Sequence, residues 1–295
     1  MISTRVAASR AVLDEALSTA GLDAESAEPI RLAENDLWRT TDRVVARIAR
    51  PGQEAAAARE VAVARWLNDE GVAAVRPLDI EQPVFAAGRA TTFWEELPPH
   101  RHGDEKDLAP LLRQLHDLPI PHGLGLPELN PFVRLDERIA EAVSLGGSDR
   151  KFLLDILDEL RAAWADLPPG ASPCVVHADA WGGNCAVTSS RTYLLDFERV
   201  AIGRPEWDLV STAVSVDTFG SLAEGAYLEF CASYGADVRD WPGYVTMRSV
   251  RELRLATFAA QVADHDPSAQ EEAKRRVACL RGDEGARPWG WRPVG

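Results

Sequence analysis

Apolar and polar residues alternate along the chain in two different ways. Apolar and polar residues alternate in residues 28–52, which also contain two groups of turn residues, and this predicts three short antiparallel strands. Residues 52–71 follow a helical period and end at a glycine, a common helix terminator. The turn residues are Glu34-Asn35-Asp36 and Thr41-Asp42. An amphipathic helix is predicted at the N-terminus, and further strands at residues 72–80, 83–88 and 90–97.

Beyond residue 97 the pattern becomes helical. Two prolines and a polar cluster in residues 97–105 indicate a hinge, after which apolar residues recur mainly with the helical period. The exception is residues 174–198, where two β-like runs flank a loop. Helices are predicted at residues 105–118, 135–145, 149–167, 221–235, 246–266 and 268–282.

These elements predict an α+β fold in two parts. Residues 1–97 form a small antiparallel β-rich part with a prominent helix, and residues 98–295 form a larger, mainly helical part. A cleft between two such parts is the expected place for a ligand.

Composition excludes several classes of function. The chain has 295 residues, 46% of them hydrophobic, which is enough for a sizeable core, and a net charge of −14. Nucleic acid is not expected as a partner because its phosphates require a basic surface. No apolar run approaches the roughly 18 residues of a membrane-spanning helix, and the N-terminus does not resemble a signal peptide. Four scattered cysteines predict neither a disulfide framework nor a zinc site, and indicate a cytoplasmic protein.

The stretch "VVHADAWGGN" and the later "YLLDFE" carry the candidate chemistry. Phosphoryl transfer from a nucleotide needs a carboxylate to orient the acceptor hydroxyl and take its proton, and hard oxygen ligands for magnesium. His177-Ala178-Asp179 is followed by four residues and then Asn184, and Asp196 ends an apolar run, which is the order of a kinase catalytic loop and metal-binding Asp. The whole constellation is far less common by chance than an isolated His-x-Asp.

With "GRPEWDL" further on, these blocks resemble the aminoglycoside phosphotransferase and choline kinase-like superfamily, small-molecule kinases with a protein-kinase-like fold. The resemblance implies that Asp179 is the catalytic base and that Asn184 and Asp196 bind Mg²⁺. It implies supporting roles for three further residues: His177 buttresses the loop, Glu198 reaches a second metal or pairs with an arginine, and Asp208 braces the loop from the next helix.

The lysine that kinases place on their third strand is missing. No lysine precedes residue 106, and in "VVARIARPG" either Arg47 or Arg50 stands where the lysine would, with Glu60 as its helix partner. Alanine at position 178, where the family usually has glycine, would be strained if the loop required a positive φ.

The resemblance also places the nucleotide in the small part. The phosphate-covering turn "RLAENDLWR" lacks glycine, so Asn35 is the candidate there, and the acids beside it would repel phosphate. The base edge is expected to pair with the backbone of residues Glu95, Glu96 and Leu97, which does not distinguish ATP from GTP.

Three functions remain open. The first is a Mg²⁺-dependent kinase that uses ATP or GTP to phosphorylate a hydroxyl of an aminoglycoside or other antibiotic, an amino sugar or a related metabolite. The second is a catalytically silent, nucleotide-binding regulatory pseudokinase, which is favoured because both the lysine and the glycine-rich turn are missing. Protein kinase activity is the third, although the chain lacks an Asp-Phe-Gly to Ala-Pro-Glu segment. No protein or membrane partner is evident.

Overall fold

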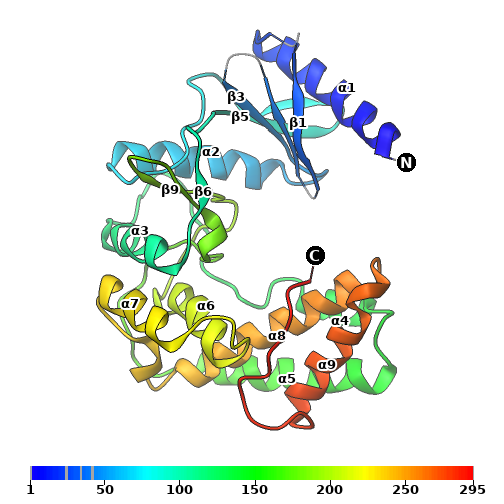
Figure 1. Ribbon diagram of the computed structural model, residues 1–295, viewed down its shortest axis with the longest axis vertical. Coiled ribbons are helices and arrows are strands. Elements are labelled where there is room, and N and C mark those ends of the chain that lie inside the picture. The colour runs from blue at the N-terminus through cyan, green and yellow to red at the C-terminus, as the bar shows by residue number, and fades with distance from the viewer. Residues whose placement is uncertain (1, 24–25, 34, 41–42, 295) are drawn as a thin grey trace. The chain divides into compact units, whose positions relative to one another are not determined.

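A computed structural model describes residues 2–23, 26–33, 35–40 and 43–294, with the side chains of residues 2 and 3 excepted (Figure 1). The chain divides into two compact units, Met1–Pro127 with Gly182–Ala201, and Glu128–Trp181 with Ile202–Gly295. The fold is α+β, with an antiparallel sheet in the N-terminal region and a helical C-terminal part, as expected. The division at residue 97 into a nucleotide-binding and a catalytic part concerns function and stays a prediction.

The first unit is built on a five-stranded antiparallel sheet in the order β1-β2-β3-β5-β4. Its strands are β1 (Glu28–Leu32), β2 (Asp36–Arg39), β3 (Val44–Ile48), β4 (Val84–Ala86) and β5 (Arg89–Glu95). The first three are the short strands predicted from the alternation. Glu34 and the second turn, Thr41-Asp42, lie outside the described residues.

Helix α1 (Ile2–Ala20) packs on one face of this sheet (Figure 1). Leu13 and Leu17 are completely buried there against Trp38, Ala46 and Ile48. Because successive side chains of a strand point to opposite faces, Arg47 faces away from this core. That alternation places the guanidinium on the side of helix α2 (Glu54–Asp69).

The prediction of a strand at residues 72–80 is wrong. This segment makes only two isolated bridges, between Ala74 and Leu194 and between Pro77 and Trp94. Its main-chain hydrogen bonds go to Leu194 at residues 73 and 75 but to strand β5 at residues 76 and 78, so no continuous ladder forms.

The rest of the first unit consists of helix α3 (Glu105–Asp117) and a small sheet in the order β6-β8-β9. Its strands are β6 (Arg101–His102), β8 (Cys185–Val187) and β9 (Thr192–Leu194), with the 3₁₀ turn η1 (Gly182–Asn184) before β8. The two β-like runs around the loop at 177–184 do not pair with each other. Strand β7 (Cys174–Val176) pairs with β10 (Ala201–Gly203) instead, while β9 pairs with β8.

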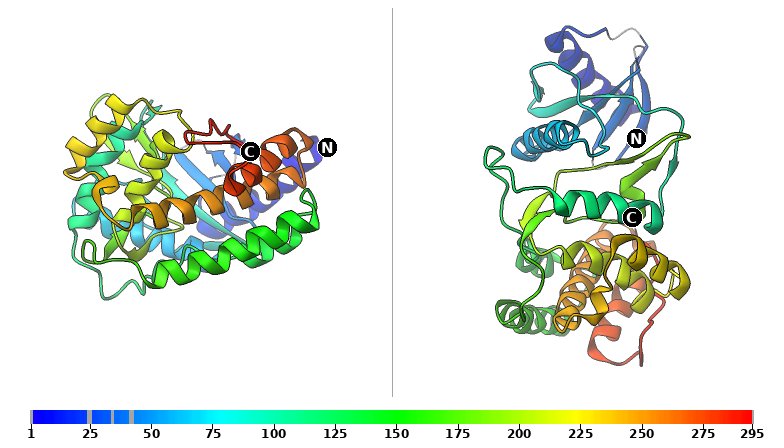
Figure 2. Two further views of the ribbon diagram at one scale, coloured as in Figure 1. Left: turned by 90° about the horizontal axis from the view of Figure 1, so that it is seen from below. Right: turned by 90° about the vertical axis from the view of Figure 1, so that its left-hand side faces the viewer.

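The second unit is mainly helical, and α8 lies at its centre. Helices α4, α5, α6 and α9 all pack against α8, and Figure 2 shows α5 and α8 running side by side. Its helices are α4 (Leu135–Glu141), α5 (Gly147–Ala165), α6 (Glu206–Asp217), α7 (Glu224–Tyr234), α8 (Tyr244–Ala263) and α9 (Gln270–Arg281), with 3₁₀ turns η2 (Val238–Asp240) and η3 (Pro267–Ala269). The predicted helices are confirmed.

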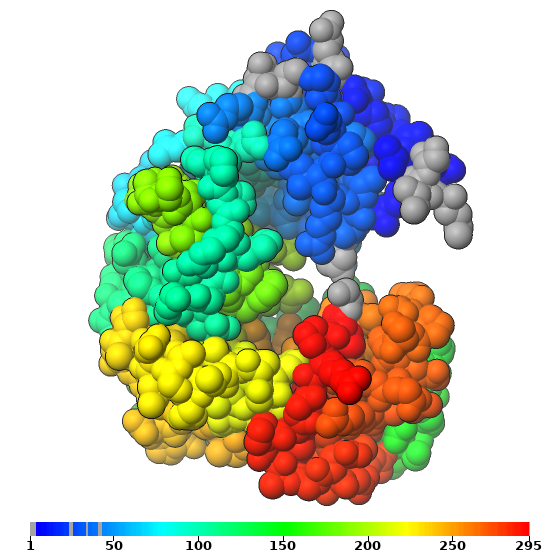
Figure 3. Space-filling view, viewed as in Figure 1, coloured from blue at the N-terminus to red at the C-terminus, as the bar shows by residue number. Residues whose placement is uncertain are grey.

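The segment after α9 lies on the surface of the helical unit (red in Figure 3). It is anchored by Trp289 and Trp291, which stack on each other and are buried with Cys279. The guanidinium of Arg276 is almost fully buried beneath it, 5.0 Å from the ring of Trp291, and donates to the carbonyls of Leu255 and Arg292.

None of the helices in the described ranges is long and apolar enough to cross a membrane.

Candidate active site

The residues singled out from the sequence fall in both units. The second unit contains His177, Asp179 and Asp208; the first contains Asn184, Asp196, Glu198 and the small-sheet residues.

Asp208 holds the start of the loop that follows β7. It lies in the first turn of α6 and is completely buried. Its two carboxylate oxygens accept hydrogen bonds from the backbone N–H of His177 at 2.7 Å and of Ala178 at 2.8 Å. Bonds to a charged acceptor are about twice as strong as neutral ones, so this carboxylate fixes the backbone just before Asp179.

The backbone of Ala178 is left-handed, with φ +64°. Only glycine adopts this conformation without a steric cost, because the Cβ of other residues crowds the following carbonyl. The strain considered from the sequence is therefore present in the structure. The two bonds to Asp208 hold this conformation against its intrinsic cost.

Asp179 follows this turn and is half-buried, whereas Trp181 is 57% exposed. His177 is fully buried, which suits a residue that supports the loop from inside. A half-buried carboxylate is reachable from solvent, as a base for a small-molecule hydroxyl must be.

Asn184 and Asp196 lie at the same end of the small sheet in the first unit. Strands β8 and β9 pair Cys185 with Leu194, and the ladder extends because the N–H of Leu195 donates to the carbonyl of Asn184 at 2.9 Å. Asp196 comes next and, like Ala178, is left-handed, with φ +61°. Its side chain is 39% exposed.

This pair offers one amide and one carboxylate oxygen, a donor set that suits Mg²⁺. Within the described part of the chain, no group of three or more His, Cys, Asp or Glu could hold a metal on its own. The residues therefore fit an ion that takes its remaining ligands from nucleotide phosphates and water, which is how Mg²⁺ is usually bound.

Arg47 connects three elements of the first unit. From β3 its Nη1 donates to Glu60 of α2, and its Nη2 lies 3.0 Å from Glu198 Oε2 and 3.4 Å from Asp196 Oδ1. Its side chain is only 15% exposed. Of the two arginines left open by the sequence, Arg47 is the one that pairs with the helix glutamate.

Arg50 is one of the residues that line a surface cavity, together with Arg59 and Arg199. Its backbone N–H donates to the Asn35 side chain at 3.4 Å.

The turn before β2 is less acidic than its sequence suggests. The carboxylate of Asp36 is buried and is bound by Arg89 at 2.9 Å, Ser9 at 2.9 Å and Arg5 at 3.3 Å. These contacts offset the charge of Asp36 on the α1 side of the sheet, and the expected repulsion of phosphate at this turn stays a prediction. Glu34 lies outside the described residues.

Most amides of the segment expected to meet the base are already used. The N–H of Glu95 donates to the carbonyl of Arg76 at 2.9 Å, and that of Glu96 to the carbonyl of Arg43 at 2.7 Å. Within the described residues, Leu97 is left as the amide of this segment without a main-chain hydrogen bond.

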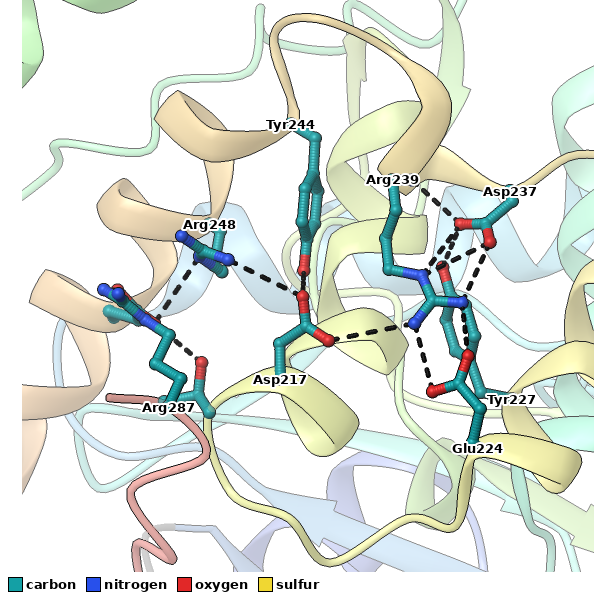
Figure 4. A network of polar contacts seen from close by, with 10 residues as sticks. Asp217, Glu224, Tyr227, Asp237, Arg239, Tyr244, Arg248 and Arg287 are labelled. Atoms are coloured by element: carbon teal, nitrogen blue, oxygen red, sulfur yellow. Dashed lines mark hydrogen bonds and ion pairs between the residues drawn. The ribbon is translucent and has the colours of Figure 1, made fainter. Parts of the chain in front are cut away.

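A polar network in the second unit was not found from the sequence (Figure 4). Asp217, at the end of α6, accepts a hydrogen bond from Tyr244 at 2.6 Å and lies 3.6 Å from Arg248 and 3.8 Å from Arg239. Burial and the bond to Asp217 raise the pKa of Tyr244. Because the network joins residues far apart in the chain, only its charged residues were visible in the sequence.

The sequence model of the phosphotransferase enzyme family matches residues 26–253, more than three quarters of the chain. The chain belongs to the phosphotransferase enzyme family. The match confirms the resemblance drawn from the motifs. A search of curated proteins finds no match.

Solved kinase structures share the fold. The structure of amicoumacin kinase in complex with AMP-PNP, Ca²⁺ and the compound abbreviated Ami is similar, with a TM-score of 0.70 and 15% identity. The similarity covers 94% of this chain and 95% of that one. Spectinomycin phosphotransferase in complex with ADP and spectinomycin has a TM-score of 0.65 and 13% identity, with the same coverage. A choline/ethanolamine kinase family protein from Mesorhizobium loti has a TM-score of 0.64 and 20% identity, over 94% of each chain.

At these identities the likeness shows the fold alone. Membership of the phosphotransferase enzyme family supports a phosphotransferase activity.

Proposed function

We propose that the protein transfers the terminal phosphoryl group of ATP or GTP to a hydroxyl of a small molecule, with Mg²⁺ bound by Asn184 and Asp196. The observation that carries the proposal is Arg47, a largely buried cation in contact with Glu60, Asp196 and Glu198. Such an arrangement joins a phosphate-binding cation to a metal-binding carboxylate, the two groups that phosphoryl transfer needs close together.

Each residue has a role in this reaction. Asp179 accepts the proton of the acceptor hydroxyl while the hydroxyl oxygen forms a bond to the terminal phosphorus. The bond between that phosphorus and the bridging oxygen of the nucleotide breaks, which leaves a nucleoside diphosphate. Arg47 binds the nucleotide phosphates, and Glu60 keeps its guanidinium in place. Asp208 holds the loop in front of Asp179 through the N–H groups of His177 and Ala178. When bound, Mg²⁺ neutralises phosphate charge.

The nucleotide base pairs with the backbone at Leu97 and the carbonyls beside it. Asn35 covers the phosphates from the β1–β2 turn. Four buried free cysteines support a reducing, cytoplasmic setting.

The acceptor is a hydroxylated small molecule such as an aminoglycoside or other antibiotic, an amino sugar or a related metabolite. Support comes from the neighbours: one is bound to spectinomycin and another is a choline/ethanolamine kinase family protein. The net charge of −14 favours a cationic acceptor.

A catalytically silent nucleotide-binding protein is the second candidate. It is favoured by the arginine at position 47, which stands where kinases place a lysine and is not a conservative replacement for it.

One assay separates the two. The protein is incubated with ATP or GTP, Mg²⁺ and a panel of aminoglycosides, nucleoside antibiotics, macrolides and amino sugars, and products are searched by mass spectrometry for one added phosphoryl group. Asp179→Asn is the matched control. Product from the wild type alone supports the kinase, whereas silence across the panel with nucleotide bound supports the second candidate.

A further inference from the structure

A surface cavity of about 330 Å³ lies in the first unit, between the start of α2 and the segment after Asp196. Nothing in the proposed reaction uses it. Its lining comes from two stretches of chain, Arg50, Gly52, Gln53, Ala55, Ala56 and Arg59 on one side, and Glu198 and Arg199 on the other.

Arginines dominate the lining of the cavity. Three line it, against one carboxylate, that of Glu198, which is bound by Arg47 at 3.0 Å, while Glu54 next to the lining accepts from the N–H of Gly52 at 3.3 Å. A protein with a net charge of −14 and 32 basic residues in all concentrates three of them here. Positive charge gathered in a concave surface attracts anions more than the same charge on a flat surface.

Arg59 is the decisive residue. It is half-buried, and its Nη1 donates to the main-chain carbonyl of Glu198 at 3.3 Å. Among the described residues it forms no ion pair, so its charge is not offset by a carboxylate within 4 Å. A guanidinium held at one nitrogen keeps further N–H groups for a ligand in fixed directions.

The first turn of α2 adds donors of a different kind. Gln53 is the N-cap and makes no side-chain capping bond, and Ala55 and Ala56 of this first turn line the cavity. The amides of a helix's first turn have no partners within the helix, and the helix dipole favours negative charge there. Together with the arginines, this gives both main-chain and charged donors around one cavity.

We propose that this cavity binds a phosphoryl group, held by Arg59 with Arg50, Arg199 and the first turn of α2. Planar guanidinium groups and helix amides are the donors that proteins use for phosphate. The phosphoryl group comes either from a free anion such as inorganic phosphate or pyrophosphate, or from the terminal phosphate of a nucleotide. The site does not depend on the proposed kinase activity.

The test is isothermal titration calorimetry of the full chain with pyrophosphate and with inorganic phosphate, in EDTA and low chloride. The wild type is compared with Arg59→Ala, with Arg59→Gln, which keeps polar donors but removes the charge, and with Arg65→Ala. Arg65 is the matched control: it lies on the same helix, also donates to main-chain carbonyls and does not line the cavity. Thermal melts check that each variant is folded.

We expect saturable pyrophosphate binding by the wild type and by Arg65→Ala, weaker by at least about 10-fold in Arg59→Ala, since a charged hydrogen bond is lost. Arg59→Gln should also bind more weakly. Binding should fall as chloride is raised. Equal binding by wild type and both Arg59 variants, equal loss in Arg65→Ala, or no binding by the wild type would overturn the proposal.

Two nucleotides identify the source of the phosphoryl group. If Arg59→Ala weakens ATP but not AMP, the cavity takes a nucleotide's terminal phosphate. If ATP affinity is unchanged while pyrophosphate binding is lost, the cavity takes a free anion. The calorimetry measures binding and not turnover, so it tests this site separately from the kinase proposal. A protein that binds pyrophosphate but is inactive in the acceptor panel would support this site and refute the kinase.

Discussion

Replacing Ala178 by glycine should stabilise the protein, although glycine usually does the opposite. Ala178 has φ +64°, and a left-handed conformation costs a residue with a Cβ about 1–2 kcal/mol. Glycine removes that cost but loses about 0.4–1 kcal/mol through the greater freedom of the unfolded chain. The net expectation is a gain of about 0–1.6 kcal/mol in the free energy of unfolding, or about 0.8 kcal/mol at the midpoints of the two ranges.

The left-handed conformation at position 178 is kept because the backbone there is held by the rest of the unit. Asp208 accepts from the N–H of Ala178 at 2.8 Å and from that of His177 at 2.7 Å, so the loop cannot relax to a negative φ without breaking a bond to a buried carboxylate. Glycine therefore enters the same conformation and keeps both bonds.

Urea unfolding followed by circular dichroism, supported by thermal melts, measures the effect. A change of 1 kcal/mol corresponds to about 2–4 °C in Tm for a domain of 150–250 residues. Ala236→Gly is the control: Ala236 is an exposed loop alanine whose φ is not positive, so glycine there should destabilise by about 0.4–1 kcal/mol. If Ala178→Gly destabilises the protein as much as Ala236→Gly does, the strain at Ala178 is not real.

Three other expectations follow from the site and its surroundings. Asp208→Asn should destabilise the protein by about 1–3 kcal/mol in the same unfolding assay, because one buried N–H would face an amide NH₂; an unchanged midpoint would contradict the bracing role. Burial raises the pKa of Cys185 to about 12, so the thiolate is scarce at pH 8, and Ellman's reagent should modify this buried thiol only after denaturation. Asn184→Ala should raise the Mg²⁺ concentration needed for half-maximal rate, and Asp196→Ala should do so more, since a charged ligand is lost; an unchanged Mg²⁺ dependence in Asp196→Ala would refute its role as principal ligand.

Local periodicity predicted most of the fold. The three N-terminal strands, the helix that follows them and the helices of the second unit other than α6 are encoded by residues close in sequence, through apolar spacing and turn residues. Residues 72–80 had a strand-like composition, but a strand also needs one partner along its length, and this segment changes its partner from Leu194 to strand β5.

Pairing between distant segments was the part that the sequence could not give. The runs at 174–176 and 192–194 look like the two arms of one hairpin, yet each has a different partner, because register depends on which other strands are available. For the same reason, the contacts of the turn acid Asp36 with Arg89 and Ser9 could not be predicted from the sequence.

The motifs predicted which residues to consider at the candidate site, but not their contacts. Spacing singled out Arg47 and Glu60 as a possible pair, yet it left Arg50 as an alternative. The structure brings Arg47 together with Glu60, Asp196 and Glu198, and places Arg50 in the lining of the cavity with Arg59. No local signal connects Arg59 with Arg199, since 139 residues separate Arg59 from its partner Glu198.

The central claim is that Asp179 is the base of a phosphotransferase, and Asp179→Asn tests it most directly. On the acceptor identified by the panel, kcat should fall by about 10²–10⁴-fold, the usual contribution of a positioned base. The nucleotide Kd, measured by calorimetry, should stay close to that of the wild type, because Asp179 acts on the acceptor hydroxyl and the change is nearly isosteric. A folded Asp179→Asn variant with kcat near that of the wild type would contradict the account.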